Sequence, residues 1–443
     1  MLLNNVYDRF RINAPLMRGV SRTAPRLTVV GTALGMCCSA AFAQAAPVVS
    51  QPEVRTFAQP LLGQVSANSA LSVIAAGNAD RLSIAPTLNT VYDTNVLRRA
   101  QPKGADTGNL RVTPGVSILL RRSLGRFALN LSGTAGYDFN SRYRFLNRSR
   151  IDFAGGVKAP VGAICTANFT AAYDQYQFDL GDVTQTVGTT TRNQNYDLAL
   201  GCSRKAGISP VGGVTYHTGT SGGISLYDYT QLSERVGLAY AQPSLGTVTL
   251  TAAASQLRRP NIVDTIGIDD STNIRSLTLS LDRAVSQRVQ LSVAVGFTEA
   301  NPDRSGVSSF AGLSYNGRVN WNIVPLFSIA GSAARQVTSE NGISATYVIR
   351  EDYRLSADWQ FSQASQVSLS ASRVQRDFRG ESLTATVQPV LSDRTSIVGA
   401  GYHYNTARWL RLGLGVTHQW RTADNRLYNY QSTIISGSIG TRF

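Results

Sequence analysis

From residue 81 to the end of the chain, apolar and polar residues alternate in runs of 10–17 residues, separated by turn-rich stretches. In the stretch RVQLSVAVGF (288–297), for example, every second residue is a large apolar one. A period of two is that of a β-strand with one apolar face. The runs are about twice the usual length of a soluble strand and close to the roughly 9–11 residues that a tilted strand needs to cross a bilayer.

The connections between these runs also alternate in length. Short ones fall near 121–125, 159–162, 205–209, 242–246, 283–287, 323–325, 362–365 and 405–408, and long polar ones near 98–108, 140–148, 179–193, 220–226, 258–272, 299–308, 337–343, 378–394 and 421–427. Short turns at one end and long loops at the other are typical of outer-membrane barrels. The pattern predicts an all-β fold, a transmembrane antiparallel up-and-down β-barrel of about 18 strands over residues 81–443. The stretch SLTATVQPVL within 378–394 is compatible with a loop or a strand, so the predicted number of strands ranges from 16 to 18.

The alternative fold is a soluble all-β protein such as a propeller or a sandwich. The two differ in the second face of the strands, which here carries mostly Ser, Thr, Gly, Asn, Gln and Arg. Such residues make a poor core and a good water-filled lumen. We therefore expect the apolar face to contact lipid and the polar face to line a lumen.

The first 80 residues lack this alternating pattern. Residues 1–43 combine five Arg with the apolar, small-residue stretch LTVVGTALGMCCSAAFA, which ends in an A-x-A cleavage pattern. This is the pattern of a cleaved secretory signal peptide. Residues 44–80 show no clear period, and we expect a loosely structured periplasmic segment there.

The chain ends on STIISGSIGTRF, in which Ile435, Ile439 and Phe443 stand at even spacing. This stretch resembles the C-terminal assembly signal of bacterial outer-membrane barrels, although larger residues are usual at Gly437 and Thr441. The resemblance implies recognition by the barrel-assembly machinery. Tyr428 and Tyr430 are out of phase with Ile435, so either a bulge intervenes or these tyrosines face the lumen.

Two further stretches resemble one family. TLNTVYDTNVLRR, with Tyr92, Asp93, Asn95 and Arg98, resembles the first-strand signature of outer-membrane β-barrel porins that accompany exopolysaccharide gene clusters. GAGYHYNTARWLRLGLGVTHQWRTADN (399–425) is similar to the closing hairpin of that family. The resemblance implies a location in the bacterial cell outer membrane and a role in surface-polysaccharide assembly or export, with a periplasmic polysaccharide-export component as a partner. It implies no catalytic residue and no cofactor.

The chain carries a formal net charge of +15, and almost all of its cations are Arg. They are spread along the chain without a nucleic-acid-binding motif, which argues against nucleic acid as a partner. By strand parity we expect nine of them to face the lumen: Arg111, Arg126, Arg150, Arg288, Arg318, Arg350, Arg354, Arg376 and Arg411.

Two roles are open for these Arg residues. Rings of Arg select anions in pores, and the planar guanidinium binds carboxylates bidentately, so the lining suits an acidic polysaccharide. Alternatively, the Arg residues form structural ion pairs with lumen carboxylates such as Asp138, Asp152, Asp352 and Asp358. Arg residues near the rims are also candidates for binding outer-membrane lipids, in particular lipopolysaccharide phosphates.

Cys165 and Cys202 remain once the signal peptide is removed, in an oxidising compartment. If the hairpin between them folds about residues 183–184, they face each other, and Phe169 then pairs with Leu198 on the same apolar face. We expect a cross-strand disulfide near the periplasmic rim, with two free thiols as the alternative.

An outer-membrane enzyme is the remaining class. The chain holds three His, at 217, 403 and 418, without a G-x-S-x-G or H-E-x-x-H motif or any paired metal-ligand spacing. We therefore expect neither catalysis nor a metal site. The leading hypothesis is a passive conduit for export of an anionic exopolysaccharide. The alternatives are a general or anion-selective small-solute porin and a structural or assembly barrel with a closed lumen.

Overall fold

A computed structural model describes residues 81–98, 100, 107–177, 190–202, 204, 206–222, 225–339, 345–380, 390–405 and 410–441. The predicted signal peptide (1–43), the predicted periplasmic segment (44–80) and Phe443 lie outside the described residues. Within them, no helix is long and apolar enough to cross a membrane.

The described residues form eighteen strands, one short α-helix and three 3-10 turns. The strands are β1 (Arg81–Asp93), β2 (Asn109–Leu124), β3 (Phe127–Asn140), β4 (Arg148–Val161), β5 (Cys165–Gln177), β6 (Thr190–Cys202), β7 (Gly207–Ser221), β8 (Tyr229–Gln242), β9 (Gly246–Arg258), β10 (Ser271–Ala284), β11 (Val289–Pro302), β12 (Phe310–Val324), β13 (Phe327–Thr338), β14 (Tyr347–Gln360), β15 (Ser365–Arg379), β16 (Ser392–Asn405), β17 (Leu410–Ala423) and β18 (Tyr430–Thr441). The helical pieces are η1 (Arg144–Leu146), η3 (Ser225–Tyr227), α2 (Pro260–Ile266) and η4 (Arg426–Tyr428).

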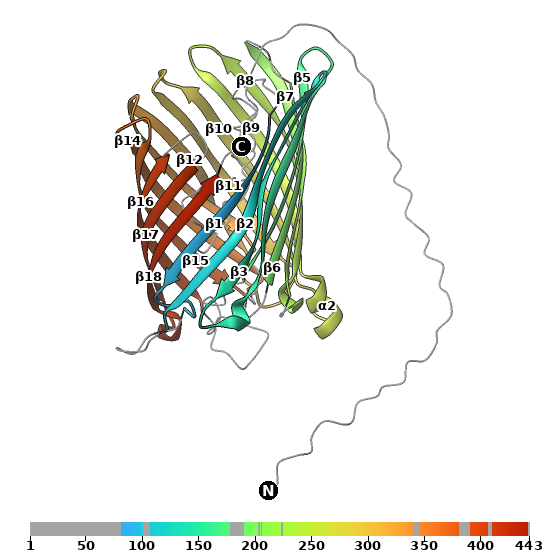
Figure 1. Cartoon of the computed structure of the whole chain (residues 1–443). Coiled ribbons are helices and arrows are strands. Elements are labelled where there is room, and N and C mark those ends of the chain that lie inside the picture. The colour runs from blue at the N-terminus through green and yellow to red at the C-terminus, as the bar shows by residue number, and fades with distance from the viewer. Residues whose placement is uncertain are drawn as a thin grey trace, which may run out of the picture. The chain divides into compact units, whose positions relative to one another are not determined.

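The strands close into one antiparallel barrel. Each strand pairs with its neighbours in the sequence, and β1 pairs with β18 through the register Thr87↔Gly440 to Asp93↔Ile434. Figure 1 shows β1 beside β18, with all strands tilted relative to the barrel axis. The predicted fold and the count of 18 strands are confirmed. β15 pairs directly with β16, so the stretch 380–391 is a connection and the 16-strand alternative is excluded.

The two ends of the barrel differ in their connections. At the short-connection end, where β1 begins and β18 ends, the strands are joined by two to four residues. The β2–β3 turn consists of residues 125–126, and Gly125 has a φ of 62°, a conformation that a residue without Cβ adopts at no steric cost. At the long-connection end the joining segments are several residues longer, and one of them carries α2 (Figure 1).

The two faces of the wall follow the predicted parity. The outward residues are large and apolar, and many are exposed, such as Leu82 at 61%, Val236 at 68% and Leu414 at 63%. A soluble protein rarely exposes such a continuous apolar surface, whereas a lipid-facing wall requires it. The inward positions are mostly Gly, Ser, Thr, Asn and charged residues, as the lumen of a water-filled barrel requires.

Candidate functional site: the lumen wall

Asp138 on β3 holds two Arg residues from the neighbouring strands. Its carboxylate accepts from Arg150 Nη2 of β4 at 3.0 Å and lies 3.8 Å from Arg111 Nε of β2. The Thr113 hydroxyl donates to the same carboxylate at 2.6 Å. Asp138 is fully buried, while the two Arg side chains keep 15% and 22% of their surface exposed. One carboxylate therefore neutralises only one of two guanidiniums in this cluster.

Asp393 on β16 repeats this arrangement across β15–β17. Arg376 Nε of β15 donates to it at 2.9 Å, and Arg421 Nη2 of β17 lies 2.5 Å from its second oxygen. All three side chains are buried. Arg421 also lies over the ring of Tyr428 in η4, at 5.7 Å from the ring centroid. Burial raises the pKa of the Tyr428 phenol, and the nearby Arg421 charge opposes that rise.

Asp352 on β14 is the third carboxylate with two guanidiniums. Arg350 Nε donates to it at 2.8 Å, and Arg354 Nη2 lies 3.8 Å from its other oxygen. These three residues stand at alternate positions of one strand and share its inward face. Arg350 is buried, whereas the Arg354 side chain is 47% exposed. The exposed Arg354 carries the positive excess of this cluster into the lumen.

Two further ion pairs contain one Arg for each Asp. Arg235 on β8 reaches across β7 to Asp197 on β6, with Nη2 at 2.8 Å from Oδ2. Arg98, which follows β1, lies with Nη1 at 2.8 Å from Asp93 Oδ2 and over the ring of Tyr430. Neither pair was among the candidate sites predicted from the sequence. Arg235 and Asp197 have the inward parity of their strands, which is the signal that identifies them.

The remaining predicted Arg residues lie apart from these clusters. Arg318 on β12 and Arg411 on β17 are exposed on inward positions and have no ion-pair partner among the described residues. Arg126 and Arg288 lie in short turns rather than on strands, because β3 begins at Phe127 and β11 at Val289. Arg288 Nη1 donates to the Ile323 carbonyl at 3.3 Å. These two Arg residues belong to the short-connection rim and not to the wall.

The predicted partner carboxylates have different surroundings. Asp138 and Asp352 hold the clusters described above. Asp358 accepts from the Gln366 amide at 3.1 Å, and Asp152 stands opposite Thr134 and Asp174 in the sheet register. The structural pairing expected as one of two roles is thus present for part of the Arg set and absent for another part.

An apolar cluster lies at the long-connection end. Its buried members come from six strands, β8 to β11 and β13 to β14, with Phe310 of β12 packed against them: Tyr229, Leu257, Ile274, Ala300, Val337, Tyr347 and Ile349. The Tyr347 hydroxyl donates to the Ser308 carbonyl at 2.6 Å, and Arg259 Nη2 donates to Ser339 Oγ at 2.9 Å. The second bond joins the connection after β9 to the end of β13, four strands away. Inward side chains of β8 to β11 are therefore packed together at this end of the barrel.

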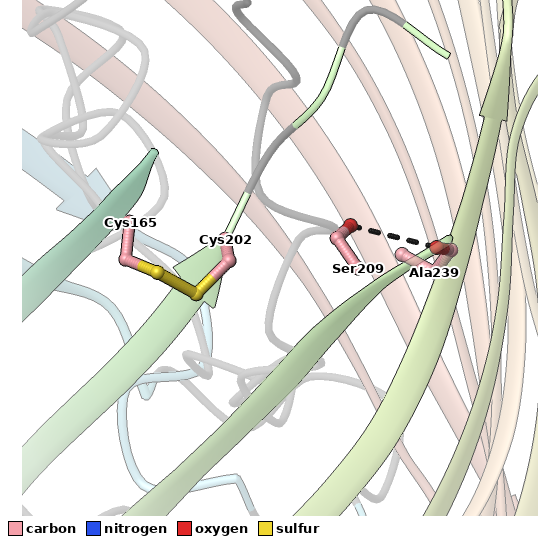
Figure 2. Close-up of a disulfide and its surroundings, with 4 residues drawn as sticks. All are labelled: Cys165, Cys202, Ser209 and Ala239. Atoms are coloured by element: carbon pink, nitrogen blue, oxygen red, sulfur yellow. Dashed lines mark hydrogen bonds between the residues drawn. A yellow bond between two sulfur atoms is a disulfide. The ribbon is translucent and has the colours of Figure 1, made fainter. Parts of the chain in front are cut away.

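Cys165 at the start of β5 and Cys202 at the end of β6 form a disulfide at the short-connection end (Figure 2). The two residues are directly opposite each other in the sheet register, and Phe169 stands opposite Leu198. Ser209 and Ala239 lie on the next two strands in the same view. The bridge thus links two neighbouring strands that are connected at the far end by residues 178–189.

The last strand presents Ile435 and Ile439 outward, at 55% and 46% exposure. β18 pairs with β17 without a register shift from Arg421↔Tyr430 to Leu410↔Thr441. Tyr430 is buried on the inward side, and Tyr428 lies in η4 before the strand. No bulge intervenes in this strand, so the out-of-phase tyrosines are explained by the inward parity of Tyr430.

Two of the three histidines lie beside a hydroxyl. His217 Nε2 lies 2.8 Å from the Tyr229 hydroxyl, and His418 Nδ1 lies 2.9 Å from Thr433 Oγ1. Within the described part of the chain, His, Cys, Asp and Glu form no group of three that is suited to a metal ion.

One family model matches the second part of the chain. Residues 281–443 match the model of the family described as "Putative beta-barrel porin 2". No curated protein matches the chain.

Solved structures with a similar barrel include a BenF-like porin from Pseudomonas fluorescens Pf-5, at 12% identity and a TM-score of 0.44, covering 83% of this chain and 100% of that one. OccK5 (OpdH) of Pseudomonas aeruginosa has 12% identity and a TM-score of 0.42, covering 82% and 98%. The siderophore receptor PirA of the same species has 11% identity and a TM-score of 0.40, covering 83% and 81%. The described residues thus form a closed 18-stranded barrel with an apolar outward face, and the second part of the chain matches a porin family model.

Proposed function

We propose that this barrel is a passive pore that prefers anions, and that its physiological cargo is an acidic exopolysaccharide. The observation that carries the first part is the ratio of two guanidiniums to one carboxylate at Asp138, Asp352 and Asp393. In each cluster the named guanidiniums outnumber the named carboxylate by one. Fixed positive charge in a pore wall attracts anions and repels cations.

The basic clusters lie on the strands from β12 round to β4. The Asp352 cluster is on β14, the Asp393 cluster on β15–β17 and the Asp138 cluster on β2–β4, while Arg318 and Arg411 add charge on β12 and β17. The apolar cluster at the long-connection end comes from β8 to β11 and overlaps these strands at β13 and β14. We expect a polyanion to follow the basic strands, where its carboxylates meet successive guanidiniums.

The polysaccharide cargo is supported by the resemblance of TLNTVYDTNVLRR and of the closing hairpin to porins of exopolysaccharide gene clusters. A small-solute anion porin is the second candidate. The apolar side chains packed at the long-connection end and the Arg259–Ser339 bond favour it, because side chains gathered at a barrel mouth hinder a polymer more than a small solute.

The test is single-channel conductance of the refolded chain in a planar bilayer, with a polyuronate or a neutral glucan of equal length added on one side. Anion selectivity with block by the polyuronate alone supports the polysaccharide conduit. Anion selectivity with block by neither polymer supports the small-solute porin and rejects the polymer cargo. Cation selectivity contradicts both, and a barrel without conductance points to the structural or assembly role.

A further inference from the structure

The outward wall carries a shallow depression that the proposed pore does not use. It has a volume of about 610 Å³ and extends over β11 to β17. Most of its lining residues have the outward parity of Leu355, which is 57% exposed. The depression therefore lies on the side of the wall that contacts lipid rather than in the lumen.

Small residues create this depression. Gly317, Gly331, Ala333 and Ala371 stand at outward positions where neighbouring strands carry Leu, Val or Trp. A Cβ added to Gly317 would find its nearest neighbour, the Ala333 carbonyl oxygen, at 4.0 Å. A Cβ added to Gly331 would meet Val319 at an ordinary 3.4 Å. The wall is thus thin here because side chains are missing, and it leaves room for a hydrocarbon chain.

Polar groups border the depression on its long-connection side. The hydroxyls of Tyr315 and Tyr353 lie 2.7 Å apart, and Tyr353 also donates to Glu351 at 3.1 Å. Glu351 is paired with Arg335, with Nε at 3.2 Å from Oε1, so its charge is balanced. Arg373 stands opposite Tyr353, is exposed, lines the depression and has no ion-pair partner among the described residues.

The outward cations of the long-connection half lie on strands between β6 and β16. On β12 to β16 they include Arg335, Arg373 and Arg394. In the same half of β17, β18 and β1 to β5, the outward positions carry neither Lys nor Arg. Arg335 is paired with Glu351 and Arg394 donates to Gln375, whereas Arg373 stands where the apolar wall ends, at the level that lipid headgroups occupy.

We propose that this depression, with Arg373 and Tyr353, binds one phosphorylated glycolipid of the lipid A class from the outer leaflet. One acyl chain occupies the depression over Gly317 and Ala333. The phosphate accepts from the Arg373 guanidinium. The Tyr315–Tyr353 hydroxyl pair, in which Tyr315 donates to Tyr353 and Tyr353 to Glu351, borders the headgroup without donating to it. An Arg–phosphate contact is short, charge-assisted and bidentate where geometry allows, which makes Arg373 the main headgroup contact.

Native mass spectrometry of the refolded barrel tests this site with bisphosphorylated lipid A and with the same lipid after removal of its phosphates. Three variants are compared with the parent chain. Arg373→Gln removes the phosphate contact, and Gly317→Leu places a side chain in the depression, its Cβ meeting no atom closer than 4.0 Å. Arg258→Gln is the matched control, because Arg258 is an exposed outward Arg at the long-connection end of β9, away from the depression.

We expect one tightly retained lipid A, with occupancy reduced about tenfold in Arg373→Gln and unchanged in Arg258→Gln. Gly317→Leu should lower retention of the lipid with or without its phosphates. Excess inorganic phosphate should not displace the lipid, because the acyl contact remains. Equal losses in Arg373→Gln and Arg258→Gln would show general attraction to anionic lipid and overturn the proposal. Unchanged retention in Arg373→Gln would overturn it as well.

Discussion

Arg111 on β2 and Arg150 on β4 are two strands apart and approach the same carboxylate, that of Asp138 on the strand between them. In water the two guanidiniums would repel each other, and only the shared carboxylate makes their approach favourable. The cluster therefore has two properties at once. It fixes three neighbouring strands, and it leaves one positive charge on the lumen wall.

The first prediction concerns removal of this carboxylate. Asp138→Asn removes the carboxylate that the two guanidiniums share, and we expect a loss of about 1.5–3 kcal/mol in the free energy of unfolding, as for a charged hydrogen bond. Urea unfolding of the refolded barrel in detergent, followed by gel mobility, measures the change. Asp358→Asn is the control, because the described partner of Asp358 is the neutral Gln366 amide. Equal losses in both variants would contradict a special role for Asp138.

A second prediction concerns Gly133 on β3. An added Cβ there would lie 2.2 Å from Phe153 Cδ1 and 2.5 Å from the Asp152 carbonyl oxygen, because the Phe153 ring covers this glycine from the next strand. Gly133→Ala should displace the ring and destabilise the barrel by about 1–3 kcal/mol.

Gly317→Ala is the matched control for that substitution, since its added Cβ meets no atom closer than 4.0 Å. Thermal unfolding of the two variants side by side measures the difference. If Gly133→Ala unfolds at the same temperature as Gly317→Ala, the packing of the Phe153 ring does not require a glycine at position 133.

The third prediction concerns the bridge between β5 and β6. Cys165 and Cys202 are 37 residues apart in sequence, and the chain-entropy model assigns a cross-link of that span about 4 kcal/mol. Replacing both Cys with Ser should lower the free energy of unfolding by about 2–4 kcal/mol. Reductant should lower the stability of the parent chain to the same level and leave the double-Ser variant unchanged. If reductant also lowers the stability of the double-Ser variant, its effect on the parent chain cannot be assigned to the Cys165–Cys202 bond.

Most of the sequence-based prediction follows from strand parity, because a two-residue period assigns the residues of a strand alternately to its outward and inward faces. Arg150, Arg354 and Arg376 were placed on the wall in this way. Parity does not show where a strand ends. Arg126 and Arg288 were therefore assigned to the lumen wall, although they lie in turns. A hydrophobic pattern does not mark the last residue of a strand when the turn residue is long and polar.

Which carboxylate each Arg contacts could not be predicted from the sequence. That Arg111 and Arg150 share Asp138 depends on the register of three strands, which the pattern alone leaves open within two residues in either direction. Arg98 and Arg259 act from connections, where no periodicity applies, and their contacts with Asp93 and Ser339 follow from how those segments fold over the barrel end.

The most direct measurement is the reversal potential of the open pore in a potassium chloride gradient. Arg150→Gln with Arg354→Gln removes the more exposed guanidinium from the Asp138 and Asp352 clusters, and Arg258→Gln on the outward side of β9 is the control. We predict an anion-selective parent pore, a reversal potential shifted toward zero or toward cation selectivity in the double variant, and no shift in the control. A cation-selective parent pore, or a double variant with the parent's reversal potential, would contradict the proposal that these clusters set the selectivity of the lumen.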